Sequence, residues 1–161
     1  MSMPHNKTAF NRGLDLFNRG HFFDAHEVLE DVWRALPRDL SSGQHLRLHV
    51  QGVVQLAVAF HHQSKGNHVG ARSVLERGMR NISGADSSFP DLDLDRLRAD
   101  LDVWRQHLDH SEHAEEKQDD KKNDMKNEKK FEALKVGRHD VLNSGAPALP
   151  KIKIRKIRKR H

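Results

Sequence analysis

The sequence contains neither cysteine nor tyrosine. The chain therefore has no disulfide scaffold, thiolate zinc site or cysteine nucleophile, and tyrosine chemistry is excluded. Aromatic residues make up only 6% of the chain, and no apolar run approaches the length of a membrane span. Its start also lacks the apolar stretch of a signal peptide, so we expect a cytoplasmic protein.

Charge is abundant, and it is unevenly distributed along the chain. Residues 1–110 hold 13 Lys and Arg against 14 Asp and Glu, whereas residues 111–161 hold 15 against 9. Eight of the nine aromatic residues lie in the first part. We therefore predict a folded domain over residues 5–110, a charged linker over 111–150 and a basic terminal segment over 151–161. Residues 112–135 of the linker are expected to be a solvated helix or disordered.

Apolar residues recur at helical spacing throughout the domain, and no strand pattern interrupts them. The sequence predicts five helices, which end near Gly20, Leu36, Lys65, Ile82 and Leu108. A shift of 46 residues superposes Gly20 on Gly66 and residues 28–30 on residues 74–76, which indicates two related helical hairpins. We expect an all-α bundle of four to five helices built from two hairpins, with a disordered basic C-terminal tail.

The expected second helix, residues 22–36, carries polar side chains at the margin of its apolar face. At 100° per residue, His26, Glu30 and Trp33 fall on one stripe there. An imidazole and a carboxylate four residues apart lie side by side, so they could bind one metal ion or each other. Trp33 adds an apolar wall and a single N–H donor.

The expected third helix is apolar nearly all round, except along one line. Gln51, Gln55 and His62 lie on that line. Buried amides and imidazoles are costly unless they are paired, so we expect this line to face the stripe of the second helix. His45 and His49, at the polar start of the third helix, are expected to be solvated.

Two runs of residues resemble the hallmark motifs of the family catalogued as domain of unknown function 309. They are His26-x-x-x-Glu30-x-x-Trp33, preceded by Gly20-His-Phe-Phe-Asp-Ala25, and Gln51-Gly-Val-Val-Gln55-Leu-Ala-Val-Ala-Phe-His-His62. The resemblance covers roughly residues 6–110. It implies a small all-helical bundle whose His-x-x-x-Glu-x-x-Trp motif binds metal, and it implies no established activity.

Two interpretations of the polar stripes stay open. In the first, they bind a divalent metal ion (Zn²⁺, Mn²⁺ or Fe²⁺) or a small polar ligand, with no catalytic residue assigned. The metal ligands would be His26, Glu30 and His62, and the ligand-binding side chains would be Trp33, Gln51 and Gln55. If the protein is an enzyme, an open position on such an ion favours hydrolase-like chemistry. In the second interpretation, the same groups form a hydrogen-bond network that fixes helix register.

Two other functions compete with a metal site. The paired hairpins resemble tetratricopeptide-like modules, which would make the protein a non-enzymatic binding module for a partner protein. The segment 151–160, which begins with Lys151 and ends with Arg160, holds seven basic residues and no acid. Such a segment could contact RNA or an anionic surface through phosphates, without specificity because it has no aromatic residue for base stacking.

Overall fold

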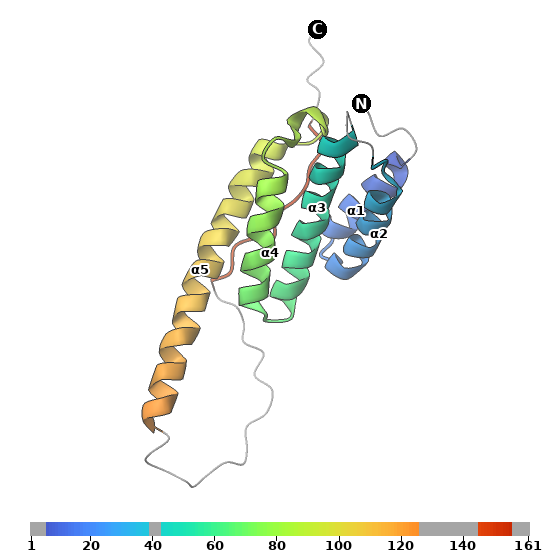
Figure 1. Cartoon of the computed structure of the whole chain (residues 1–161). Helices are drawn as coiled ribbons and strands as arrows, with labels where there is room; N and C mark the ends of the chain where they lie inside the picture. The colour runs from blue at the N-terminus through green and yellow to red at the C-terminus, as the bar shows by residue number, and fades with distance from the viewer. Residues whose placement is uncertain (1–5, 39–42, 126–144, 156–161) are drawn as a thin grey trace.

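The structure is a computed structural model that describes residues 6–38, 43–125 and 145–155. These residues form a helical bundle, which confirms the all-α expectation (Figure 1). Its elements are α1 (Lys7–Asn18), α2 (Phe22–Ala35), α3 (Gly43–Ser64), α4 (His68–Asn81), the 3-10 helix η1 (Ala85–Ser87) and α5 (Leu94–Met125). Each α-helix packs against the next one in the chain. Within the described ranges, no helix is both long and apolar enough to cross a bilayer.

Two equivalent turns join α1 to α2 and α3 to α4. Gly20 (φ 83°) and Gly66 (φ 75°) adopt the left-handed conformation that favours glycine at the end of a helix. In both turns, the backbone N–H after the glycine donates to the carbonyl five residues earlier, at 2.9 Å and 3.0 Å. The 46-residue shift places one turn on the other, so the two-hairpin architecture is confirmed.

Buried aromatic rings join α1, α2, α3 and α5. The Phe60 ring centroid lies 5.9 Å from that of Phe17, 5.5 Å from that of Phe22 and 5.2 Å from that of Trp104. All four side chains are at most 6% exposed. Phe60 on α3 contacts rings from three other helices, which explains why α3 is apolar nearly all round.

Helices α3 and α4 are in close contact at two glycines, Gly52 and Gly78. A Cβ atom on Gly52 would lie 2.6 Å from Cγ2 of Ile82 and 3.1 Å from the carbonyl oxygen of Gly78. Only hydrogen fits at such a distance in a close-packed interior. This contact sets the register of the two helices, and in that register Asn81 Nδ2 donates to Gln55 Oε1 at 2.8 Å.

Helix α5 continues beyond the expected end near Leu108. It runs to Met125, so residues 111–125, which belong to the expected charged linker, are helical. Six of these fifteen residues are Glu or Lys, which favour helix without needing a buried face. Residues 126–144 lie outside the described residues, and the expectation for them stays a prediction.

Residues 145–155, here called the strap, lie extended along the bundle (red in Figure 1). Ile152 is only 3% exposed, and the indole Nε1 of Trp104 donates to the carbonyl of Ala148 at 2.9 Å. The expectation of a disordered tail therefore needs correction for these residues, because isolated apolar side chains between the basic ones dock on the helices. Residues 156–161 lie outside the described residues, and contact of the basic terminus with RNA or an anionic surface stays a prediction.

Candidate metal centre

Helix α2 places His26 and Glu30 together at the edge of the core. The helix buries Phe22, Ala25 and Leu29, which leaves the stripe of His26 and Glu30 at the rim of the buried face. Their side chains are 25% and 27% exposed, and His26 Nε2 lies 3.3 Å from Glu30 Oε2. The pairing predicted from the i, i+4 spacing is thus present.

The carboxylate of Glu27 also lies beside His26, and sequence reasoning missed this third residue. Its Oε1 lies 3.2 Å from His26 Nδ1, on the other side of the imidazole ring. A neutral imidazole carries one N–H and can donate to only one of the two carboxylates. Adjacent residues on a helix do not normally face each other, so the spacing gave no signal for Glu27.

Arg34, one turn beyond Glu30, pairs with one of the two oxygens of the Glu30 carboxylate. Arg34 Nη2 donates to Glu30 Oε1 at 2.7 Å, while Oε2 faces His26. The guanidinium therefore fixes the carboxylate with one oxygen directed at the imidazole. A second carboxylate, that of Asp31, lies 3.9 Å from Arg34.

Trp33 contacts the next helix through Arg47. The Arg47 guanidinium carbon lies 4.1 Å from the centroid of the Trp33 ring. Arg47 Nη1 also donates to the carbonyl oxygens of Trp33 and Leu36, at 2.8 Å and 3.0 Å, and so satisfies the C-terminal end of α2. In the described part of the chain the buried indole N–H has no hydrogen-bond partner. These contacts give Trp33 a packing role.

The other predicted site residues have neighbours of their own. Gln55 accepts from Asn81 on α4, and His62 Nδ1 lies 3.2 Å from Asn67 Nδ2 in the turn after α3. Gln51 lines a cavity of about 350 Å³ on α3, together with His45, Arg47 and Leu48. Among the residues that the structure describes, no hydrogen bond or ion pair joins Gln51, Gln55 or His62 to the His26 stripe.

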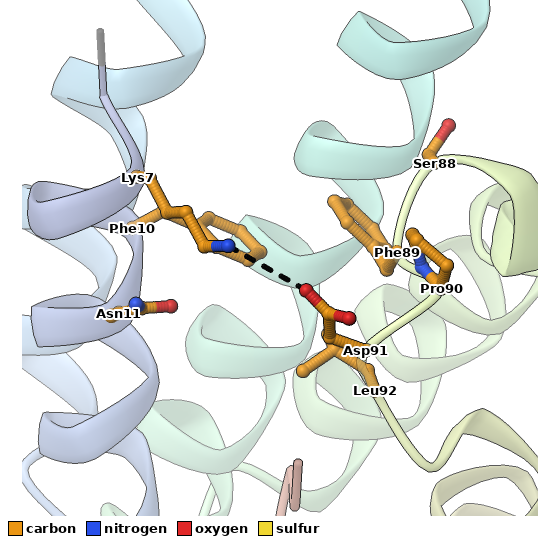
Figure 2. Close-up of a pocket in the computed structure, with 8 residues that line it drawn as sticks. All are labelled: Lys7, Phe10, Asn11, Ser88, Phe89, Pro90, Asp91 and Leu92. Atoms are coloured by element: carbon orange, nitrogen blue, oxygen red, sulfur yellow. Dashed lines mark ion pairs between the residues drawn. The ribbon is translucent and has the colours of Figure 1, made fainter. Parts of the chain in front are cut away.

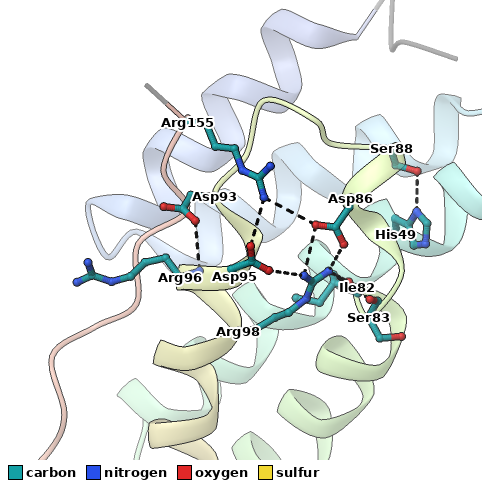
Figure 3. Close-up of polar contacts among 10 residues, drawn as sticks. All are labelled: His49, Ile82, Ser83, Asp86, Ser88, Asp93, Asp95, Arg96, Arg98 and Arg155. Carbon is teal, nitrogen blue, oxygen red and sulfur yellow. Dashed lines mark hydrogen bonds and ion pairs between the residues drawn. The ribbon is translucent and has the colours of Figure 1, made fainter. Parts of the chain in front are cut away.

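One histidine that was expected in solvent is buried. His49 is 6% exposed, because η1 folds back over the start of α3, and its Nδ1 lies 2.6 Å from Ser88 Oγ (Figure 3). Burial lowers the pKa of the His49 imidazole, His45 lowers it further, and Asp86 opposes both effects. The expectation that His49 is solvated was therefore wrong, and an amphipathic pattern could not reveal a cover formed by a distant segment.

A second cavity lies between α1 and the segment before α5 (Figure 2). Its volume is about 100 Å³, and the rings of Phe10 and Phe89 stack beside it with centroids 5.2 Å apart. Lys7 Nζ lies 3.6 Å from Asp91 Oδ2 across the gap. Pockets for small-molecule ligands usually exceed about 300 Å³. This cavity is too small for such a ligand and contains none of the predicted site residues.

Comparison with protein families supports the resemblance seen in the motifs. The family described as Domain of unknown function (DUF309) matches residues 10–74 of this chain. The matched stretch runs from α1 into α4 and includes both motifs. The resemblance to this family is thereby confirmed over these residues.

Two curated proteins are similar to parts of the chain. An "Uncharacterized protein" of Aquifex aeolicus (strain VF5) is 27% identical over 86 residues, which is 53% of this chain and 24% of the relative. The "Uncharacterized protein YpuF" of Bacillus subtilis (strain 168) is 30% identical over 77 residues, which is 48% of this chain and 41% of the relative. The match thus covers well under half the length of each relative, and neither name states an activity.

Proposed function

We propose that His26, Glu27 and Glu30 bind one divalent metal ion on α2. The observation that carries the proposal is their spacing, since one ligand atom from each residue lies within 4.8 Å of the other two. Imidazole and carboxylate donors suit Zn²⁺, Mn²⁺ and Fe²⁺, whose ligands lie about 2 Å from the ion. Arg34 holds Oε1 of Glu30, and Oε2 already faces His26 Nε2, so Oε2 needs little reorganisation to reach an ion bound at that nitrogen. The more exposed Glu27 faces Nδ1 and would have to turn toward the same ion.

The proposed site is open to solvent on one side. Glu27 is 58% exposed, whereas His26 and Glu30 are about three-quarters buried. Three protein donors leave positions on an ion that water can fill, and the chemistry that such an ion would supply is hydrolytic. In this proposal Trp33, Gln51, Gln55 and His62 do not bind the ion. Trp33 packs against Arg47, and Gln55 joins α3 to Asn81 on α4.

Titration of chelator-treated protein with Zn²⁺ and with Mn²⁺, followed by isothermal calorimetry, tests the proposal. We expect His26→Ala and Glu30→Gln each to weaken binding at least about tenfold, since each removes a ligand. Glu76→Gln is the matched control, because Glu76 is the repeat equivalent of Glu30 and pairs with Arg72 instead of a histidine. Binding should also weaken in acid, because only the neutral imidazole binds metal.

Equal affinity in the wild type and in His26→Ala would refute the proposal. An equal loss in Glu76→Gln would also refute it, because the effect would then reflect general surface charge. His62→Ala separates this site from the one that the sequence predicted. We expect it to bind as the wild type does, and weaker binding would restore His62 as a ligand.

A further inference from the structure

The strap packs on a surface of the bundle, here called the groove, whose residues hydrogen-bond to the strap main chain. The groove is formed by Asn18 at the end of α1, residues 91–93 before α5, and Trp104 on α5. Asn18 contacts one strap residue twice: its Nδ2 donates to the carbonyl of Ile152 at 2.9 Å, and its Oδ1 accepts from the N–H of Ile152 at 2.8 Å. A side-chain amide that pairs with both main-chain groups recognises an extended backbone.

Residues 91–93, before α5, hydrogen-bond to the main chain of the strap as a short β-strand would. Leu92 and Ile154 form an antiparallel bridge. The N–H of Asp93 donates to the carbonyl of Lys153 at 2.8 Å, and the N–H of Arg155 donates to the carbonyl of Asp91 at 2.7 Å. Main-chain hydrogen bonds of this kind supply affinity for an extended segment, while pockets for alternate side chains supply specificity.

Two side chains of the strap are buried, and a third pairs with a carboxylate of α5. Pro150 is buried, Ile152 is 3% exposed, and Arg155 Nη2 lies 3.5 Å from an oxygen of Asp95 (Figure 3). Between them, the Nζ of Lys151 donates to the carbonyl oxygen of Asn18, and the side chain of Ile154 is 65% exposed. The groove therefore fits an extended segment with the pattern Pro-x-Ile-x-x-Arg.

When the strap undocks, no buried charge loses its only partner of opposite sign among the described residues. Arg98 Nη2 donates to Asp86 Oδ2 at 2.7 Å, and its Nη1 donates to Asp95 Oδ1 at 3.3 Å. The hydrogen bond from Arg98 holds the pKa of the Asp86 carboxyl below its ordinary value. Both aspartates thus keep a cationic partner when Arg155 departs, and the pairs that Arg155 makes with them are largely exposed to solvent.

We propose that this groove is a peptide-docking site for the Pro-x-Ile-x-x-Arg pattern, and that its second occupant is the strap of another copy of the chain. Every copy carries both the groove and a segment that fits it, so exchange between copies forms the same contacts as docking within one copy. The strap of the same chain competes with the strap of a second copy at an effective concentration in the millimolar range. At low protein concentration the groove of the wild type is therefore filled by its own strap. The proposal is independent of the metal site, and it gives the protein-binding interpretation a specific surface.

A pair of full-length variants tests the exchange. Ile152→Asp disables the strap and leaves the groove intact, whereas Asn18→Ala disables the groove and leaves the strap intact. We expect each variant alone to be monomeric, and an equimolar mixture to form a one-to-one complex in native mass spectrometry and light scattering. Ile154→Asp is the matched control, because it makes the same change at an exposed position two residues away. Mixed with Asn18→Ala, it should form no complex, since its own strap still fills its groove.

Absence of a complex between Ile152→Asp and Asn18→Ala would overturn the proposal, as would an equal complex with Ile154→Asp. A labelled peptide of residues 145–161 provides a second measurement. We expect Ile152→Asp to bind it at least about tenfold more tightly than the wild type, because the competing strap is weakened. Arg155→Glu, a change at an exposed residue, should also increase capture if Ile152→Asp fails to fold. Equal capture by the wild type and the folded strap variant would contradict the proposal.

Discussion

Replacing Arg47 with Met removes the contact that joins α3 to the tryptophan of the motif. Arg47 Nη1 donates to two carbonyls at the end of α2, at 2.8 Å and 3.0 Å, and its guanidinium carbon lies 4.1 Å from the Trp33 ring centroid. Methionine keeps an apolar stem of similar length but lacks the charge and the donors. The substitution therefore tests how much the polar head of Arg47 contributes to the junction of α2 and α3.

The expected magnitude follows from these contacts. A hydrogen bond that involves a charged group contributes about 1.5–3 kcal/mol, and because one nitrogen serves both carbonyls at a partly exposed position we count about 2 kcal/mol. The cation–π contact adds about 0.5–1 kcal/mol. Arg47→Met should thus lower the free energy of unfolding by about 2.5–3 kcal/mol, which corresponds to a fall in Tm of about 10–15 °C for a domain of this size.

Urea denaturation followed by circular dichroism measures the change in the free energy of unfolding. A double-mutant cycle with Trp33→Leu isolates the contribution of the Trp33 ring. The carbonyl of residue 33 persists in Trp33→Leu, so the cycle reports only the contact between the ring and the guanidinium. We expect a coupling free energy of about 0.5–1 kcal/mol. A coupling of zero within error would refute the assignment of Trp33 to packing and leave its side chain available for a ligand.

Two further predictions concern stability. Gly52→Ala places a Cβ 2.6 Å from Cγ2 of Ile82, so we expect the free energy of unfolding to fall by about 1–2 kcal/mol despite the higher helix propensity of alanine. Gly145→Ala, where nothing lies within 4 Å of the new Cβ, is the control, and equal unfolding midpoints for the two variants in urea would contradict the prediction. For His49, burial holds the folded-state pKa below the ordinary value of 6.5, so the unfolded chain binds the proton more readily. The free energy of unfolding should therefore fall as the pH drops below about 6.5, and His49→Gln should remove that part of the dependence in urea titrations. If the free energy of unfolding of His49→Gln depends on pH as that of the wild type does, His49 is not the cause of the dependence.

The helices and their turns could be predicted because their causes are local. Apolar residues at helical spacing marked each helix, and Gly20 and Gly66 marked the turns that close the two hairpins. The pairing of His26 with Glu30 was equally local, since it depends only on two residues four positions apart on one helix.

The partners of the polar residues on α3 could not be predicted in the same way. A helical projection shows that Gln55 and His62 share a face with Gln51, but it does not say which neighbouring helix that face meets. The close contact at Gly52 and Gly78 sets α4 against α3, and in that arrangement Gln55 meets Asn81. The choice between two neighbours depends on packing over the whole bundle.

The sequence by itself determined the helical periodicity, the glycine turns and the side-by-side imidazole and carboxylate, because each arises from residues less than two helical turns apart. Only the tertiary structure decided that η1 buries His49, that Arg47 covers Trp33, and that the strap returns to Asn18 across 134 positions of sequence. Such contacts form when distant segments exclude water together, and no local pattern of residues encodes which segments will meet.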